Sequence, residues 1–197
     1  MRNAGLLIPL LLWLCACATQ KPLDQQAGLA DFQAKRARLA ELHSWRLQGR
    51  LALSMAKEAW SATLQWTQTP EDYLLRLIAP LGRGSFELRG DEQGVLLRLA
   101  PNQVLHAGDP ESLLQKQFGW QVPVSGLRYW VRGIPDPEVK IDRLQLDGQG
   151  RISVLQQSGW QVTYADYSSQ GGYELPGRIA MANNELKLRL VIKHWDL

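Results

Sequence analysis

Residues 45–54 read WRLQGRLALS and residues 59–67 read AWSATLQWT, and apolar side chains alternate with polar ones in both segments. This period of two is typical of a β-strand with one buried face. The alternation recurs between turn-forming residues and predicts eleven strands, at 45–54, 59–67, 73–79, 85–89, 94–99, 103–107, 139–146, 151–157, 160–167, 177–182 and 185–195. Because most connections are tight turns, we expect an antiparallel meander that curls into a barrel or part of one.

The alternation is interrupted after residue 107, where helix signals appear. Asp109 suits a helix N-cap, Pro110 the first turn and Gly119 the end. A second short helix is expected from Ser125 to near Gly133. Two helices inserted in a meander have to cover its concave face, and any apolar cavity left beneath them would be the usual form of a lipid site. The candidates for lining that cavity are Trp60, Trp66, Leu113, Leu114, Phe118, Leu127 and Trp130. Core packing is the simpler interpretation for most of the tryptophans.

Residues 29–43 show a helical period, with Leu29, Phe32, Leu39 and Leu42 on one face. A helix of this kind lies on a membrane surface or packs on its own domain. The apolar stripe is narrow, which favours packing on the domain.

The first residues have the features of a bacterial export signal. Arg2 precedes an apolar run at 4–14 that is too short to span a bilayer, and the run ends in Leu14-Cys15-Ala16-Cys17. That tetrapeptide resembles the lipobox of bacterial lipoproteins, with a small residue before the acylated Cys17. We therefore expect a signal peptide at 1–16, an acylated cysteine and polar tether at 17–26, and one lipid-handling β domain at 27–197. The alternatives are an ordinary secretory signal with stray cysteines, or a Cys-x-Cys metal or redox pair.

Composition is that of a globular domain with a core. The chain has 45% hydrophobic and 21% charged residues, and its net charge of +3 gives little support for nucleic-acid binding. The three histidines are scattered singly, so we expect no metal site. With Cys17 acylated and Cys15 removed, the domain has no disulfide.

No motif in the sequence predicts catalysis or a cofactor. There is no Gly-x-Ser-x-Gly elbow, no phosphate-binding loop before a helix and no His-Glu-x-x-His. Ser85 and the glycine-rich residues 82–84 read as turn material. We therefore expect a protein that is not an enzyme and that has no cofactor.

The loop after the strand at 73–79 presents a leucine. Pro80 and Gly82 favour a turn with Leu81 at its tip, where the side chain is expected to face solvent. A single exposed leucine needs no functional explanation on its own.

Several segments, in this order, resemble the LolB family of outer-membrane lipoprotein receptors. They are the lipobox, the helix that leads into a strand beginning WRLQGR, the Pro80-Leu81-Gly82 loop, and the segments SGLRYWVRGIP at 125–135, WQVTYADY at 160–167 and LKLRLVIKHW at 186–195. The resemblance covers nearly the whole mature chain. No single segment is decisive, but their order is specific.

The resemblance implies an eleven-stranded half-open β-barrel lidded by helices. It also implies acceptance of acylated lipoprotein cargo from the soluble periplasmic carrier LolA and insertion into outer-membrane lipid, by a monomer without an energy source. Leu81 matches the protruding leucine that the family uses for insertion. Ala18, rather than the retention aspartate, follows Cys17, which implies a lipid-anchored, periplasm-facing location at the outer membrane.

Other functions stay open on the residues alone. A soluble carrier like LolA is the nearest alternative, and the Cys17 anchor argues against it. An envelope lipoprotein that binds a small lipophile or a protein partner without transferring it is another. A lipid hydrolase would need a nucleophile in a recognisable setting, which the sequence does not offer.

Overall fold

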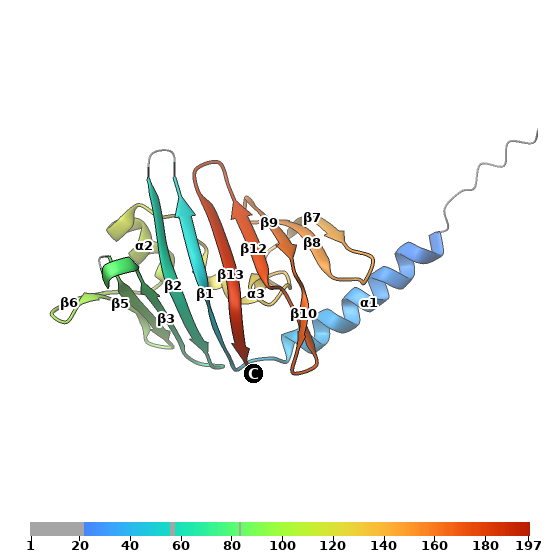
Figure 1. Ribbon diagram of the computed structural model, residues 1–197, viewed down its shortest axis with the longest axis horizontal. Helices are drawn as coiled ribbons and strands as arrows, with labels where there is room; N and C mark the ends of the chain where they lie inside the picture. The colour runs from blue at the N-terminus through green and yellow to red at the C-terminus, as the bar shows by residue number, and fades with distance from the viewer. Residues whose placement is uncertain (1–21, 56–57, 83) are drawn as a thin grey trace, which may run out of the picture.

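The computed structural model describes residues 22–55, 58–82 and 84–197, and its main feature is one open antiparallel sheet (Figure 1). Its eleven strands are β1 (Trp45–Ser54), β2 (Ala59–Gln68), β3 (Tyr73–Ile78), β4 (Phe86–Asp91), β5 (Gly94–Ala100), β6 (Gln103–Ala107), β7 (Ile141–Leu146), β8 (Ile152–Gln157), β9 (Trp160–Ala165), β12 (Arg178–Ala182) and β13 (Lys187–Asp196). All eleven predicted strands are confirmed, with ends that differ by at most two residues. The sheet is curved and open, with β6 and β7 as its edges.

The sheet consists of two meanders joined by the first and last strands. One runs from β1 out to β6, the other from β13 out to β7, and β1 pairs with β13 in the middle. The pairing shifts register between Gln48 and Gly49. A Cβ atom at Gly49 would lie 2.5 Å from the carbonyl oxygen of Val191, so the close approach of the two strands requires glycine there.

Two helices cover the concave face of the sheet, behind the strands in Figure 1: α2 (Pro110–Phe118) and α3 (Val124–Trp130). The predicted ends of α2 are confirmed. The Asp109 side chain accepts a hydrogen bond from the Ser112 backbone N–H at 2.8 Å, and Gly119 ends the helix with a φ of 72°. α3 occupies the predicted position and begins one residue earlier than expected.

The N-terminal helix α1 (Pro22–Ala40) packs along the β7–β8 side of the sheet and extends away from it (Figure 1). Phe32, Leu39 and Leu42 are buried as predicted, whereas Leu29 is 49% exposed. The helix is longer at its start and shorter at its end than the predicted 29–43, so residues 22–26, which we assigned to the tether, are helical. Of the helices that the structure describes, none combines the length and the apolar character that crossing a membrane requires.

A small hairpin was missed in the sequence. β9 ends at Ala165 because Asp166 adopts a left-handed φ of 55°, and the chain then forms β10 (Ser168–Gln170) and β11 (Tyr173–Leu175) as a separate two-stranded sheet. The Gly171-Gly172 pair between them is a hairpin turn signal that the sequence contains.

Candidate functional site

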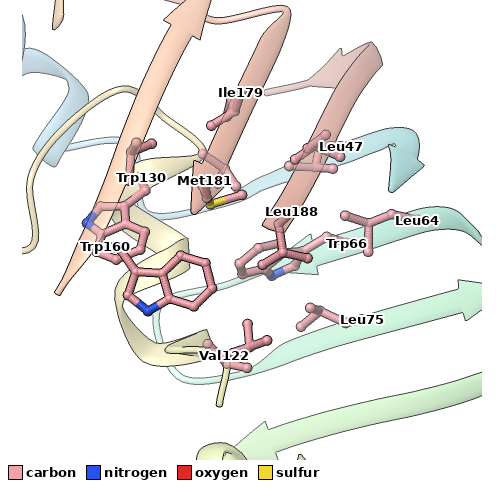
Figure 2. Packing of buried hydrophobic residues seen from close by; sticks show 14 of the residues in the cluster. Leu47, Leu64, Trp66, Leu75, Val122, Trp130, Trp160, Ile179, Met181 and Leu188 are labelled. Atoms are coloured by element: carbon pink, nitrogen blue, oxygen red, sulfur yellow. The ribbon is translucent and has the colours of Figure 1, made fainter. Parts of the chain in front are cut away.

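An apolar cavity lies between the concave face of the sheet and the α2–α3 helices. All of its lining residues are hydrophobic, and they come from six strands, both helices, the segment between the helices and the residue directly after α3: Leu51, Leu53, Leu64, Trp66, Leu75, Leu77, Phe86, Leu88, Leu114, Trp120, Val122, Val124, Leu127, Val131, Met181, Leu188 and Leu190. Leu64, Leu75 and Leu188 extend from the strands toward the segment that carries Val122 (Figure 2). Such a surface binds apolar groups and offers no hydrogen bond to orient polar ones.

The cavity has little free space in this conformation. Its volume is about 60 Å³, less than half of the roughly 150 Å³ of an engineered cavity that admits benzene. This space is too small to enclose a long acyl chain.

The structure places three of the seven predicted cavity residues at this site. Trp66, Leu114 and Leu127 line it. Trp60 and Phe118 belong to an aromatic cluster next to it, while Leu113 and Trp130 are buried in the surrounding core. Whether these side chains contact a ligand stays a prediction.

Eight of the seventeen lining residues are strand leucines that the sequence analysis does not name as cavity candidates. The period of two does mark them, because they occupy the buried positions of their strands. The period does not distinguish a side chain at a cavity from one in a solid core, and we gave more weight to tryptophan than to leucine.

The aromatic cluster connects β2 and β4 with α2 and the segment after it. Trp60 stacks on Phe86 with ring centroids 5.8 Å apart, and Phe118 stacks on Trp120 at 4.6 Å. Phe86 and Trp120 also line the cavity. Trp60, Phe118 and Trp120 are only partly buried, so the cluster forms one end of the cavity wall and reaches the surface.

A buried amide fixes α3 to the sheet. Gln157 of β8 is fully buried, and its Oε1 accepts hydrogen bonds from the Trp130 indole N–H at 2.9 Å and the Asp136 backbone N–H at 3.0 Å. Its Nε2 donates to the carbonyl oxygens of Asp136 at 2.8 Å and Val139 at 2.7 Å. All four hydrogen bonds of the amide are made, which holds the C-terminal end of α3 and the segment after it.

A buried guanidinium joins α3 to α1. Arg132 donates from Nη1 to the carbonyl oxygens of Leu39 and Leu42, both at 2.8 Å, and from Nε to the carbonyl oxygen of Arg128 at 2.9 Å. Leu39 lies in the last turn of α1 and Leu42 just after the helix, so these bonds satisfy carbonyl groups where a cation is favourable. Burial lowers the pKa of the Arg132 guanidinium to about 10, so it remains charged at neutral pH.

By contrast, α2 has few polar attachments. Glu111 accepts a hydrogen bond from the Ser125 backbone N–H at 2.8 Å, which links the two helices. Leu113 and Leu114 contribute apolar contacts with the core. Hydrogen bonds therefore attach the C-terminal end of α3, whereas α2 is attached mainly by apolar packing.

The β3–β4 loop presents Leu81 as predicted. Leu81 is 95% exposed and lies in a short 3-10 turn, Pro80–Gly82, with a left-handed backbone (φ 59°, ψ 18°) that is unfavourable for leucine. At the base of the loop, the Ala79 backbone N–H donates to the Ser85 hydroxyl at 3.0 Å. The fold therefore holds an apolar side chain out in solvent at the expense of local backbone strain.

Other predicted features are located as follows. Cys17 and residues 18–21 lie outside the described residues. His43, His106 and His194 are apart in the fold, and within the described ranges no group of three metal-binding side chains occurs.

Comparison with known proteins relates the chain to one family. The family model described as outer membrane lipoprotein LolB matches residues 43–195. A protein named outer-membrane lipoprotein LolB from Nitrosococcus oceani is 41% identical, and the match covers 95% of this chain and 96% of that protein. A protein of the same name from Pseudomonas putida KT2440 is 39% identical, with 96% of this chain and 92% of that protein covered.

Solved structures with similar folds are distant in sequence. A LolA superfamily protein from Nitrosomonas europaea superimposes with a TM-score of 0.53 at 10% identity and covers 87% of this chain and 92% of its own. A DUF1329 family protein from Desulfovibrio piger gives a TM-score of 0.55 at 8% identity, with 86% and 91% covered. At these identities the likeness concerns the fold alone.

Proposed function

Because the chain belongs to the LolB family of outer-membrane lipoproteins, we propose that it accepts lipoproteins from the periplasmic carrier LolA and inserts them into the outer membrane. The observation that carries this proposal is the cavity between the sheet and the two helices, whose lining is entirely apolar. Acyl chains are the part of a lipoprotein that such a lining binds.

The transfer runs downhill without an energy source. Burying acyl methylenes contributes about 0.8 kcal/mol each, so a site that buries more of the chain takes it from one that buries less. The bilayer buries the chains more completely than the protein does, and the cargo leaves for the membrane. In this proposal, displacement of α2 enlarges the small cavity, while Gln157 and Arg132 hold α3 in place.

Transfer is tested by mixing the acylated full-length protein with LolA that carries a radiolabelled lipoprotein. We expect the label to move to the protein and then into liposomes, with no nucleotide added. If folded protein takes up no label from loaded LolA, the proposed function is wrong.

We propose that acyl chains on Cys17 anchor the protein in the outer membrane. This anchor holds the domain on the periplasmic side. Cys17→Ala is expected to abolish acylation and leave an unprocessed precursor, because the thiol that carries the diacylglycerol is gone. Cys15→Ala is the matched control and should be processed normally, since bulky Leu14 precedes Cys15 where a small residue is needed. Mass spectrometry of the mature N-terminus distinguishes them, and acyl groups on Cys15 would contradict the assignment.

Leu127 tests whether the cavity binds acyl chains. It lies on α3 and lines the cavity, so Leu127→Gln places a polar amide against the ligand. We expect an acylated peptide to compete about tenfold less well for a hydrophobic fluorescent dye, which corresponds to about 1.4 kcal/mol of lost binding.

The neighbouring Arg128 supplies the control for this measurement. Its side chain contacts the Tyr129 hydroxyl and is not among the lining residues, so Arg128→Gln should leave dye competition unchanged. Equal effects of the two substitutions would show that the dye does not report on this cavity.

A further inference from the structure

A second cavity lies between α1 and the β7–β8 and β10–β11 turns, and its described lining residues are all different from those of the apolar cavity. Its volume is about 100 Å³. The charged side chains that line it are four cations and one carboxylate: Lys35, Arg36, Arg38, Arg151 and Glu174.

Two of these cations already have carboxylate partners. Arg151 pairs with Asp147 at 2.7 Å and with Glu174 at 3.2 Å. Lys35 pairs more loosely with Asp31 at 3.5 Å, and its ammonium also donates to the carbonyl oxygen of Gln149. The single carboxylate in the lining is therefore occupied by Arg151.

The other two cations are free to bind a ligand. In the part of the chain that the structure describes, neither Arg36 nor Arg38 has a carboxylate within ion-pair distance. The Arg38 guanidinium lies over the Tyr173 ring, 4.9 Å from its centroid. This cation–π contact engages the charge of Arg38 without a carboxylate.

Glycine brings the walls of this cavity close to α1. Gly150 and Gly172 have left-handed φ values of 69° and 82°. A Cβ atom at Gly172 would lie 2.9 Å from Nη2 of Arg38, and one at Gly150 would lie 3.2 Å from the carbonyl oxygen of Gly28. The turns therefore adopt a backbone that favours glycine and leave no room for a side chain where they meet the helix.

We propose that this cavity binds a phosphate group through Arg36 and Arg38. The planar guanidinium presents paired donors that match phosphate oxygens. A volume of about 100 Å³ is well above the roughly 10–15 Å³ that holds a single water, so the cavity has room for a small anion. The excess of cations over carboxylates in the lining attracts an anion to this site.

The phosphate belongs to a lipid headgroup or to a free phosphate ion. Cys17 precedes Pro22, the first residue of α1, by five residues, a reach of about 17 Å when extended. An acylated Cys17 thus keeps the start of α1 close to the membrane. Only this lipid source rests on the proposed function, because phosphate binding itself requires no anchor.

Binding is measured on the full-length chain by calorimetric titration with sodium phosphate, against sodium chloride at equal ionic strength. Arg36→Gln combined with Arg38→Gln is expected to weaken phosphate binding at least tenfold. The matched control combines Arg50→Gln with Arg189→Gln, which removes two exposed cations from β1 and β13 and should change binding by less than twofold. If the wild-type protein does not bind phosphate, or if both double variants bind it equally, the proposal is overturned.

A second pair of substitutions guards against loss of folding. Arg36→Lys with Arg38→Lys keeps both charges but removes the paired donors, so we expect an intermediate loss of affinity. If the affinity for phosphate is unchanged in both the lysine and the glutamine variants, Arg36 and Arg38 do not bind phosphate.

Vesicle flotation separates the two phosphate sources. It uses the mature chain from Ala18 onward, which carries neither the acyl anchor nor the apolar signal segment, and phosphatidylcholine vesicles with or without phosphatidic acid. If the phosphate belongs to a lipid headgroup, phosphatidic acid should increase flotation of the chain with native Arg36 and Arg38. The variant with both arginines replaced by glutamine should show no such increase. If the site binds only a free phosphate ion, the glutamine variant should bind phosphate more weakly in calorimetry, and all variants should float equally.

Wild-type protein that binds phosphate but accepts no cargo from LolA would remove the proposed function and leave this inference standing.

Discussion

Leu81→Glu is expected to lower insertion of cargo into liposomes about a hundredfold while leaving acceptance from LolA unchanged. Leu81 is 95% exposed, so its replacement should change the free energy of unfolding by no more than about 0.5 kcal/mol. In a bilayer interface the leucine contributes about 2 kcal/mol of apolar burial, and a carboxylate adds a desolvation cost of at least about 1 kcal/mol. Their sum, about 3 kcal/mol, corresponds to the hundredfold loss. Both transfer steps are measured on the same folded protein.

Leu81→Gly separates the side chain from the backbone. Glycine tolerates the left-handed φ of 59°, which relieves about 1 kcal/mol of strain and offsets the greater entropy of glycine in the unfolded chain. We expect stability within about 1 kcal/mol of the wild type together with an insertion loss of about tenfold or more.

Leu197→Glu is the matched control for both Leu81 substitutions. Leu197 is 44% exposed and follows β13 at the other end of the sheet from the Leu81 loop. Insertion should stay at the wild-type level in this variant. Loss of acceptance in Leu81→Glu, or equal losses in Leu81→Glu and Leu197→Glu, would remove the insertion role of Leu81.

Gln157→Leu is expected to destabilise the domain by about 4 kcal/mol or more. Leucine has a similar volume but leaves the Trp130 indole N–H, the Asp136 backbone N–H and the Val139 carbonyl without their hydrogen-bond partner, while the Asp136 carbonyl keeps only a long bond, 3.5 Å, from the Val139 N–H. Each buried polar group left unpaired costs about 1–3 kcal/mol. Urea unfolding followed by tryptophan fluorescence measures the change in the free energy of unfolding.

The neighbouring Gln156→Leu gives the control. Gln156 is only partly buried and makes one side-chain contact, from its Nε2 to the Gln161 amide oxygen at 3.3 Å. Its replacement should change stability by about 0.5 kcal/mol or less. If Gln157→Leu has an equally small effect, Gln157 does not hold α3 in the way described.

Local sequence determined which segments form strands and helices. The period of two depends only on neighbouring residues, so it predicted all eleven strands of the sheet and, for β1 and β2, the face that is buried. Asp109 and Gly119 marked the ends of α2 because capping requires particular side chains and backbone angles at fixed positions. The exposure of Leu81 followed from the proline and glycine on either side of it. The order of segments in the chain also identified the family.

Only the tertiary structure decided how these elements meet. Periodicity assigns a strand its buried face but not its partner, and so the pairing of β1 with β13 and the roles of Gln157 and Arg132 were not predicted. The cavity depends on the same long-range contacts. Leu75 and Leu188 line it, while Leu47 and Ile179, at equally buried strand positions, fill the solid core. The choice depends on where along its strand a residue lies relative to α2 and α3, because Leu47 and Leu51 both belong to β1 and only Leu51 lines the cavity. That placement depends on how the whole sheet curves.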